Sequence, residues 1–251
     1  VRRGWRSHGA LQNVLKFAAQ GLMVAFTIAL VMVPICMLVA RRLNIVDKPG
    51  GRKQHEQVTP LLGGVGVTLA AGLGLWVINR YAASAAGFDL KLGETLWVLV
   101  AATIMFVTGV FDDLFKDRMA FHTKLLGQVA GVLMLMGPHL WRLMTEGGPI
   151  EAWIYQLFFL CWYLTIINSF NFSDNMNGLM AGLSVIAFSA SLFYLGHQYS
   201  VRSLSFAALL VGALLGFLPY NFPRSRVFLG DAGSMFVGFW MAWIQFDLSK
   251  G

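Results

Sequence analysis

Charged residues are scarce in this sequence, and that scarcity excludes a soluble globular domain. Only 12% of the 251 residues are charged and 57% are hydrophobic, whereas soluble domains carry about 25% charged residues. Cysteine is scarce too: Cys36 and Cys161 both lie inside apolar runs, which indicates neither a disulfide framework nor a cysteine metal site. The net charge of +7 is scattered and forms no continuous basic stripe, so nucleic-acid binding is not expected. The composition predicts a polytopic membrane protein.

Long apolar runs are what the sequence has instead. Each run is close to the ~20 residues that a membrane-spanning helix needs. No soluble domain, low-complexity segment or convincing repeat separates them. We therefore predict an all-α fold with about eight transmembrane helices in a single domain, residues 1–251. The runs cover residues 22–40, 61–78, 95–111, 125–141, 152–170, 178–196, 203–222 and 228–246.

Eight spans determine which loops share a side of the membrane. The loops after the first, third, fifth and seventh spans hold ten basic residues, and the other three loops hold four. The positive-inside rule places the first set in the cytoplasm, although the basic segment before the first span disagrees. The cytoplasmic set also holds seven of the twelve acids, which can meet around one cleft. These acids are Asp47, Glu56, Asp112, Asp113, Asp117, Asp174 and Asp231.

The first motif is the basic loop 47–55, DKPGGRKQH, followed by Pro60-Leu61-Leu62-Gly63-Gly64. One interpretation is that this loop binds a phosphorylated substrate. The alternative is a topogenic loop beside lipid headgroups. The residues by themselves leave both open.

The second motif is Asp112-Asp113 at the end of the third run, with Lys124 further along. Adjacent carboxylates at a membrane boundary are unfavourable unless they meet a cation. Mg²⁺ is commonly held by one or two carboxylates together with substrate phosphates, and Lys124 could then contact a phosphate. The alternative is a solvated loop with local ion pairs.

The third motif spaces Asn168, Asn171, Asp174 and Asn177 at intervals of three residues between two apolar runs. That spacing can line one side of a helical turn with amides and a carboxylate. The alternative is a tight turn between helices, because Asn, Ser and Asp all favour turns.

The fourth motif is Val227-Phe228-Leu229-Gly230-Asp231-Ala232-Gly233-Ser234. An aspartate at the start of an apolar run is expected to face a protein interior or a water-filled cleft. A helix that begins here would direct free N–H groups toward a phosphate bound beside Asp231. The alternative role for Asp231 is that of a plain helix cap.

Taken together, the motifs resemble the polyprenyl-phosphate N-acetylhexosamine-1-phosphate transferases, and among them the undecaprenyl-phosphate GlcNAc-1-phosphate transferase branch. The matches run in family order from about residue 44 to about residue 238. They are Asp47-x-Pro49-x-x-Arg52-Lys53-x-His55, Pro60-x-x-Gly63-Gly64, Asp112-Asp113, Lys124-Leu125-Leu126-Gly127-Gln128, Asn168-x-x-Asn171-x-x-Asp174, Gly178-Leu179 and Phe228-x-Gly230-Asp231-x-Gly233-Ser234.

The resemblance implies that sugar 1-phosphate passes from a UDP-N-acetylhexosamine to polyprenyl phosphate, with release of UMP, to initiate cell-wall or surface polysaccharide. It implies a bacterial inner-membrane protein, a cytoplasmic site, a Mg²⁺ (or Mn²⁺) cofactor and a homodimer. Asp231, Asp112 and Asp113 would be the catalytic residues and metal ligands, with Asp112 as the base. The implied substrate-binding residues are Arg52, Lys53, His55, Lys124, Asn168, Asn171, Asp174, Asn177, Gly230 and Ser234.

Three features depart from the family pattern. Asn177 stands where the family often has a second aspartate, and the spacing from Asp113 to Lys124 is slightly long. The family also continues with further spans and a histidine-rich cytoplasmic loop, so we expect the sequence to be incomplete after Gly251. These departures keep open a truncated homologue that binds polyprenyl phosphate without catalysis. A Mg²⁺-dependent membrane prenyltransferase is a second alternative, although the Asn171/Asp174 turn and the His55 loop argue against it.

Overall fold

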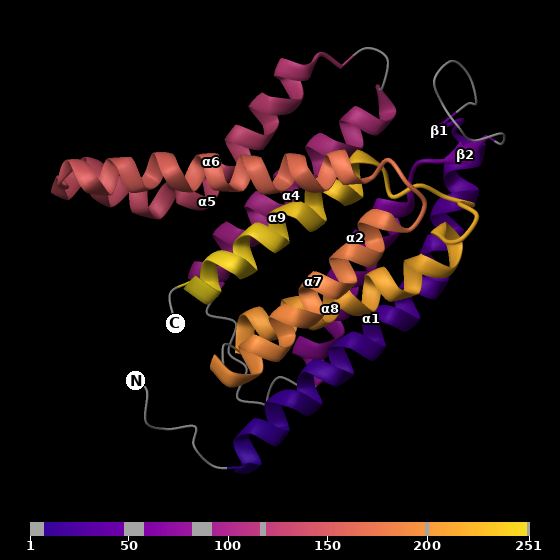
Figure 1. Ribbon diagram of the computed structural model, residues 1–251, viewed down its shortest axis with the longest axis horizontal. Coiled ribbons are helices and arrows are strands. Elements are labelled where there is room, and N and C mark those ends of the chain that lie inside the picture. Colours follow the sequence, from indigo (N-terminus) through magenta and orange to yellow (C-terminus); the bar gives the residue numbers. More distant parts are fainter. Residues whose placement is uncertain (1–7, 48–57, 82–91, 116–118, 199–200, 250–251) are drawn as a thin grey trace.

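The computed structural model describes residues 8–47, 58–81, 92–115, 119–198 and 201–249, and in them it contains eight helices and a small sheet (Figure 1). Two short strands, β1 (Val46–Asp47) and β2 (Thr59–Pro60), pair antiparallel, with Val46 opposite Pro60. The helices are α1 (His8–Arg42), α2 (Gly63–Tyr81), α4 (Leu92–Leu114), α5 (Phe121–Glu146), α6 (Ile150–Ser173), α7 (Leu179–Gln198), α8 (Val201–Asn221) and α9 (Gly230–Ser249).

Each predicted apolar run corresponds to one of these helices, and their ends agree to within five residues, except that α1 begins at His8, 14 residues before its predicted run. The all-α prediction is confirmed, and only the two-residue strands were not predicted. Helices form here because a helix satisfies its own backbone hydrogen bonds, which a membrane interior cannot do.

The outer surface is that of an integral membrane protein. Large apolar side chains such as Met23, Phe158 and Phe193 are exposed by 59%, 63% and 76%, where a soluble protein would place polar groups. Among the described residues, four helices are long and apolar enough to cross a membrane. They cover Leu15–Arg42, Thr95–Leu114, Ile150–Ser173 and Arg202–Asn221. The count of eight spans stays a prediction.

Two central helices, α8 and α9, hold most of the core. Helix α8 packs against α1, α7 and α2, and α9 packs against α4, α6 and α2. Small residues permit these close approaches, as is common between helices in membranes. A Cβ added to Gly212 of α8 would lie 2.1 Å from the carbonyl oxygen of Leu22 on α1. The start of α9 lies beside the ends of α4 and α6 and the start of α2.

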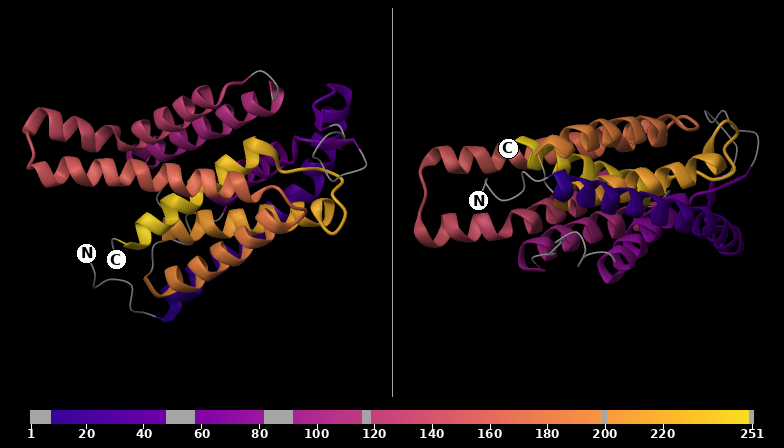
Figure 2. Two further views of the ribbon diagram at one scale, coloured as in Figure 1. Left: turned by 45° about the horizontal axis from the view of Figure 1, so that its top comes forward. Right: turned by 90° about the horizontal axis from the view of Figure 1, so that it is seen from below.

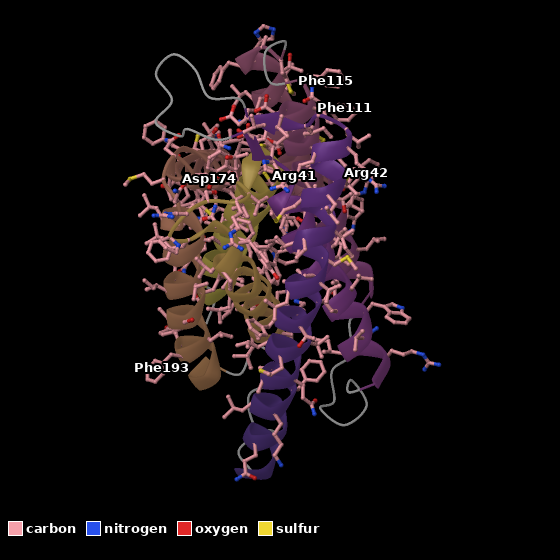
Figure 3. The ribbon with its side chains drawn as sticks, turned by 90° about the vertical axis from the view of Figure 1, so that its right-hand side faces the viewer. Arg41, Arg42, Phe111, Phe115, Asp174 and Phe193 are labelled. Carbon is pink, nitrogen blue, oxygen red and sulfur yellow. The ribbon has the colours of Figure 1, made fainter. Side chains whose placement is uncertain are left out.

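The views of the whole molecule place these helix ends together. Figure 3 shows Asp174 at the same end of the bundle as Arg41, Arg42 and Phe111, with Phe193 toward the other end. Figure 2 shows the α5–α6 hairpin projecting beyond the rest of the bundle. The predicted gathering of alternate loops on one side is therefore seen in the described residues.

Candidate active site

The segment before α9 is bound along the start of α2. The Phe228 N–H donates to the Pro60 carbonyl at 2.9 Å. In return, the N–H groups of Gly63 and Gly64 donate to the carbonyls of Phe228 at 3.1 Å and Leu229 at 2.8 Å. The Pro60-x-x-Gly63-Gly64 motif therefore positions the residues that lead into Asp231.

Two carboxylates, one at the end of α4 and one directly after α6, cap the N-terminus of α9. Asp113, only 5% exposed, accepts from the N–H groups of Asp231 at 2.9 Å and Ala232 at 3.0 Å. Asp174 accepts from the Gly230 N–H at 3.1 Å. Negative charge is favourable at this end of a helix.

These caps correct two expectations. The prediction of free N–H groups at the start of α9 is wrong for Gly230, Asp231 and Ala232, because carboxylates of the protein already accept hydrogen bonds from these groups. Asp113 is also not part of a solvated loop, because it lies buried within α4. The prediction that Asp113 ligates a metal stays a prediction, but both of its oxygens are engaged by backbone.

Glycine is required at two positions around this cap. Gly230 has φ +73°, and a Cβ there would lie 2.6 Å from the Leu61 carbonyl oxygen and 2.7 Å from the Asp113 carboxylate. Only glycine adopts this backbone conformation without strain. On the other side, a Cβ at Gly109 of α4 would lie 2.4 Å from the Asp231 carbonyl oxygen.

Lys124 lies at the centre of the site. Its Nζ is 2.7 Å from Asp112 Oδ2 and 2.8 Å from Asp231 Oδ1, and it donates to Asn171 Oδ1 at 3.0 Å. These contacts bring together residues of α4, α5, α6 and α9. We call Asp112, Asp113, Asp174, Asp231 and Lys124 the acid cluster.

The acid cluster keeps Lys124 charged. Burial by itself lowers the pKa of Lys124. The negative charge of Asp231 and the hydrogen bonds to Asp112 and Asp231 outweigh burial and raise the pKa above its ordinary value. Lys124 is therefore a protonated donor at neutral pH.

Asn171 holds the Asp231 side chain in place. Its Nδ2 donates to Asp231 Oδ1 and also to Ser234 Oγ, the latter at 2.8 Å. The Asp231 side chain therefore accepts hydrogen bonds from both Lys124 and Asn171. These bonds, and not a cap of its own helix, are its observed contacts.

The three-residue spacing along α6 continues only as far as Asp174. Asn168 forms a reciprocal amide pair with Gln128, at 2.8 and 3.2 Å, so it braces α5 against α6. Helix α6 ends at Ser173, and Asn177 is exposed in the turn that follows. The helical alignment predicted for Asn177 is therefore wrong, and its part in substrate binding is untested.

The predicted residues divide into three groups. Hydrogen bonds and ion pairs connect Asp112, Asp113, Lys124, Asn171, Asp174, Gly230, Asp231 and Ser234. Asn168 and Asn177 lie outside that network. Arg52, Lys53 and His55 lie outside the described residues.

Two contributors to the site had no assigned role in the sequence analysis. Gln128 is 1% exposed. In the sequence, only the presence of an amide inside an apolar run distinguishes this residue. Gly109 is one of 27 glycines, and nothing in its neighbours marks it as the contact point for α9.

The donor set fits one divalent cation held by two protein carboxylates. Asp112 and Asp231 present carboxylate oxygens to one point of the site, while Asp113 and Asp174 cap the start of α9. Asp112 and Asp231 already converge on one cationic atom, with the Asn171 amide oxygen beside them. Mg²⁺ prefers oxygen ligands and completes its shell with water and phosphates. Among the described residues, however, no group of three His, Cys, Asp or Glu forms a complete cage.

We expect Asp113→Asn to destabilise the fold more than Asp112→Asn. Asparagine offers one acceptor where Asp113 provides two, so one α9 N–H loses a charged partner, a loss of about 1–3 kcal/mol. Asp112→Asn leaves Asp231 to pair with Lys124. Thermal unfolding of both purified variants measures the difference. Equal melting temperatures would show that the cap contributes little.

The contact at Gly109 gives a second stability prediction. Gly109→Ala forces α4 away from α9, and such overpacking destabilises by about 1–3 kcal/mol. Gly72→Ala is the matched control, because a Cβ at Gly72 meets nothing within 4 Å. We expect a lower melting temperature for Gly109→Ala and an unchanged or higher one for Gly72→Ala. A Gly109→Ala variant as stable as Gly72→Ala would contradict the close approach.

Comparison with known proteins places this arrangement in context. The sequence model of glycosyl transferase family 4 matches residues 95–249. A probable undecaprenyl-phosphate N-acetylglucosaminyl 1-phosphate transferase of Bacillus subtilis is 30% identical over 228 residues, which is 87% of this chain and 60% of that protein.

Two further relatives have related names. An undecaprenyl-phosphate alpha-N-acetylglucosaminyl 1-phosphate transferase of Escherichia coli is 29% identical, over 85% of this chain and 58% of that protein. A decaprenyl-phosphate N-acetylglucosaminephosphotransferase of Mycobacterium tuberculosis is 32% identical, over 93% of this chain and 61% of that protein. The chain thus spans about three fifths of the length of these relatives.

Proposed function

Because this chain belongs to glycosyl transferase family 4, we propose that it transfers N-acetylhexosamine 1-phosphate from a UDP-sugar to polyprenyl phosphate. N-acetylglucosamine is the proposed sugar, because the names of the relatives specify it. The product is a lipid-linked pyrophosphate sugar, and UMP is the leaving group. The proposed role is to initiate a cell-wall or surface polysaccharide.

One observation carries the proposal: a single ammonium group, Lys124 Nζ, is bound at once by Asp112, Asp231 and Asn171. Together with Lys124, these residues come from the ends of four helices, α4, α5, α6 and α9. A reaction between a lipid-borne phosphate and a soluble nucleotide sugar needs such a site, since each substrate arrives from a different phase.

The proposed reaction is a phosphoryl transfer at the sugar-bearing phosphorus. An oxygen of polyprenyl phosphate forms a bond to that phosphorus. The bond between the same phosphorus and the bridging oxygen of the UDP-sugar pyrophosphate breaks. UMP leaves with the electron pair. The attacking phosphate is already an anion, so little deprotonation is needed, and the main barrier is repulsion between two anionic groups.

The residues of this chain act on that barrier by position and charge. Lys124 is a protonated donor that contacts a phosphate oxygen in place of one of its three present acceptors, and Asn171 keeps the Asp231 carboxylate aligned. Asp113 and Asp174 hold the start of α9, and therefore Asp231, in a constant position. In the proposed arrangement, Asp112 lies beside the attacking anion. A general base would occupy the same position.

We further propose that Mg²⁺ is held by Asp112 and Asp231. Bound Mg²⁺ would neutralise the negative charge that develops on the pyrophosphate during transfer. The convergence of Asp112 and Asp231 on one cationic atom, Lys124 Nζ, supports this assignment.

The proposed location is the bacterial inner membrane, with the acid cluster facing the cytoplasm. The count of ten basic residues against four in the alternating loops supports that orientation. UDP-sugars would then reach the site directly from the cytoplasm. A homodimer stays a prediction.

Lipid labelling tests the proposed function. Membranes containing the protein at its natural coding length should incorporate radiolabelled UDP-N-acetylglucosamine into an organic-extractable product, with stoichiometric UMP release. Consumption of a prenyl diphosphate without UMP release would favour a prenyltransferase. Binding of polyprenyl phosphate with no turnover would favour a non-catalytic homologue.

A further inference from the structure

A cavity lies toward the opposite end of α9 from the acid cluster. Its volume is about 600 Å³, within the range of ~300–1,000 Å³ for ligand sites. Asp231 lies in the first turn of α9, whereas Trp243 in the cavity wall lies twelve residues later, or about 18 Å along a helix. The wall includes Trp97, Arg142, Tyr163, Arg202 and Trp243, which come from five different helices.

The cavity opens toward the turn between α5 and α6. A smaller adjoining cavity of about 290 Å³ shares His139, Arg142, Tyr155 and Gln156 with it. Figure 2 shows that the α5–α6 hairpin projects beyond the other helices here. A ligand could therefore enter from the surface of the bundle.

Two guanidinium groups border this cavity. Arg142 is exposed, and the described residues offer its guanidinium no ion pair. Arg202 lies over the ring of Trp243, 5.5 Å from its centroid. The described residues that line the larger cavity include these two guanidinium groups and no carboxylate, and Glu146 borders only the adjoining cavity. Guanidinium groups are the preferred partners of phosphate oxygens.

A buried hydroxyl lies deeper in the same wall. Tyr163 is 0% exposed, and its hydroxyl has no hydrogen-bond partner within the described part of the chain. Buried hydroxyl groups in proteins are nearly always paired, because an unpaired one is unfavourable. An alternative role for the two arginines is to anchor the protein at the lipid surface. That role does not explain why a buried hydroxyl beside them has no partner.

The rest of the wall is mainly apolar. Phe159 and Phe246 are in edge-to-face contact, with ring centroids 4.4 Å apart, and Leu135 and Met136 lie beside them in the lining. Such a surface suits a hydrocarbon chain. The cavity thus combines a cationic rim, an inner hydroxyl donor and an apolar wall.

We propose that this cavity binds an anionic phospholipid. The phosphate pairs with Arg142 and Arg202, an ester oxygen accepts from the Tyr163 hydroxyl, and one chain packs against Phe159 and Phe246. The site lies at the opposite end of α9 from the acid cluster, so it does not depend on the proposed transfer reaction.

Native mass spectrometry of the detergent-purified full chain tests the proposal. Dioleoyl phosphatidylglycerol should bind about fivefold more tightly than dioleoyl phosphatidylcholine, because only the former carries net charge. Arg142→Gln should remove that preference. Tyr163→Phe should weaken both lipids about twofold to fivefold, because each has ester oxygens.

The matched control is Arg80→Gln, an exposed arginine in the last turn of α2 and outside the cavity. It should leave both affinities unchanged. Melting temperatures of all variants are compared first, so that a folding defect is recognised, and Arg142→Gln, being exposed, should fold normally.

Three results would overturn the proposal. The first is equal binding of the two lipids by the unmodified chain. The second is the same response from Arg142→Gln and Arg80→Gln, which would indicate general surface attraction. The third is displacement of the phospholipid by an equal concentration of inorganic phosphate, which would show that the cavity takes the free anion.

Discussion

Replacing Asp231 with asparagine should lower the rate of sugar-phosphate transfer by about a thousandfold or more. Asp231 Oδ1 binds Lys124 at 2.8 Å and also accepts from Asn171. Asparagine keeps the size of the side chain but removes the charge that aligns Lys124 and that would hold Mg²⁺. Loss of one charge-stabilising group at a phosphoryl or acyl transfer site typically costs about 10²–10³ in kcat, and here two functions are lost together.

The measurement is single-turnover incorporation of radiolabelled UDP-N-acetylglucosamine into lipid at saturating polyprenyl phosphate. Glu146→Gln is the control, because it also neutralises one carboxylate, but at an exposed position in the last turn of α5. It should retain full activity. Since the main-chain N–H of Asp231 still donates to Asp113, the variant should fold normally. Unchanged transfer by Asp231→Asn would remove the proposed mechanism.

Replacing Lys124 with methionine should reduce both activity and stability. The side chains of Asp112 and Asp231 are 13% and 23% exposed and lose their shared ammonium. Removing one partner of a fully buried ion pair costs about 3–5 kcal/mol. Because this site is partly open to solvent, we expect about 1–2 kcal/mol. Transfer should fall by about a hundredfold or more, since the phosphates lose a cationic donor.

A double variant separates the two effects. Lys124→Met with Asp112→Asn removes the repulsion between the carboxylates, so it should recover the melting temperature while transfer stays low. Lys124→Arg keeps the charge and should retain the melting temperature and part of the activity. Recovery of transfer in the double variant would show that neither Lys124 nor Asp112 contacts a substrate or a required Mg²⁺.

The motifs predicted where the chemistry lies more reliably than what each residue does. Asp112, Asp113, Asp174 and Asp231 were expected to meet because the loops alternate between two sides of a membrane, and they do meet. Their separate tasks were not predictable. Asp112 and Asp113 are neighbours in the chain, yet one pairs with Lys124 and the other caps α9, because successive residues of a helix point in different directions.

The sequence alone determined the helices, their approximate limits and the end of the bundle that carries the acids. These depend on local hydrogen bonding and on the apolar length that crosses a membrane, both of which are properties of continuous segments. Only the tertiary structure decided the pairing of Asp113 with the backbone of Asp231, 118 residues away, and of Gln128 with Asn168, 40 residues away. Such contacts depend on the rotation and spacing of packed helices, which small residues such as Gly109 and Gly230 set through close backbone approach.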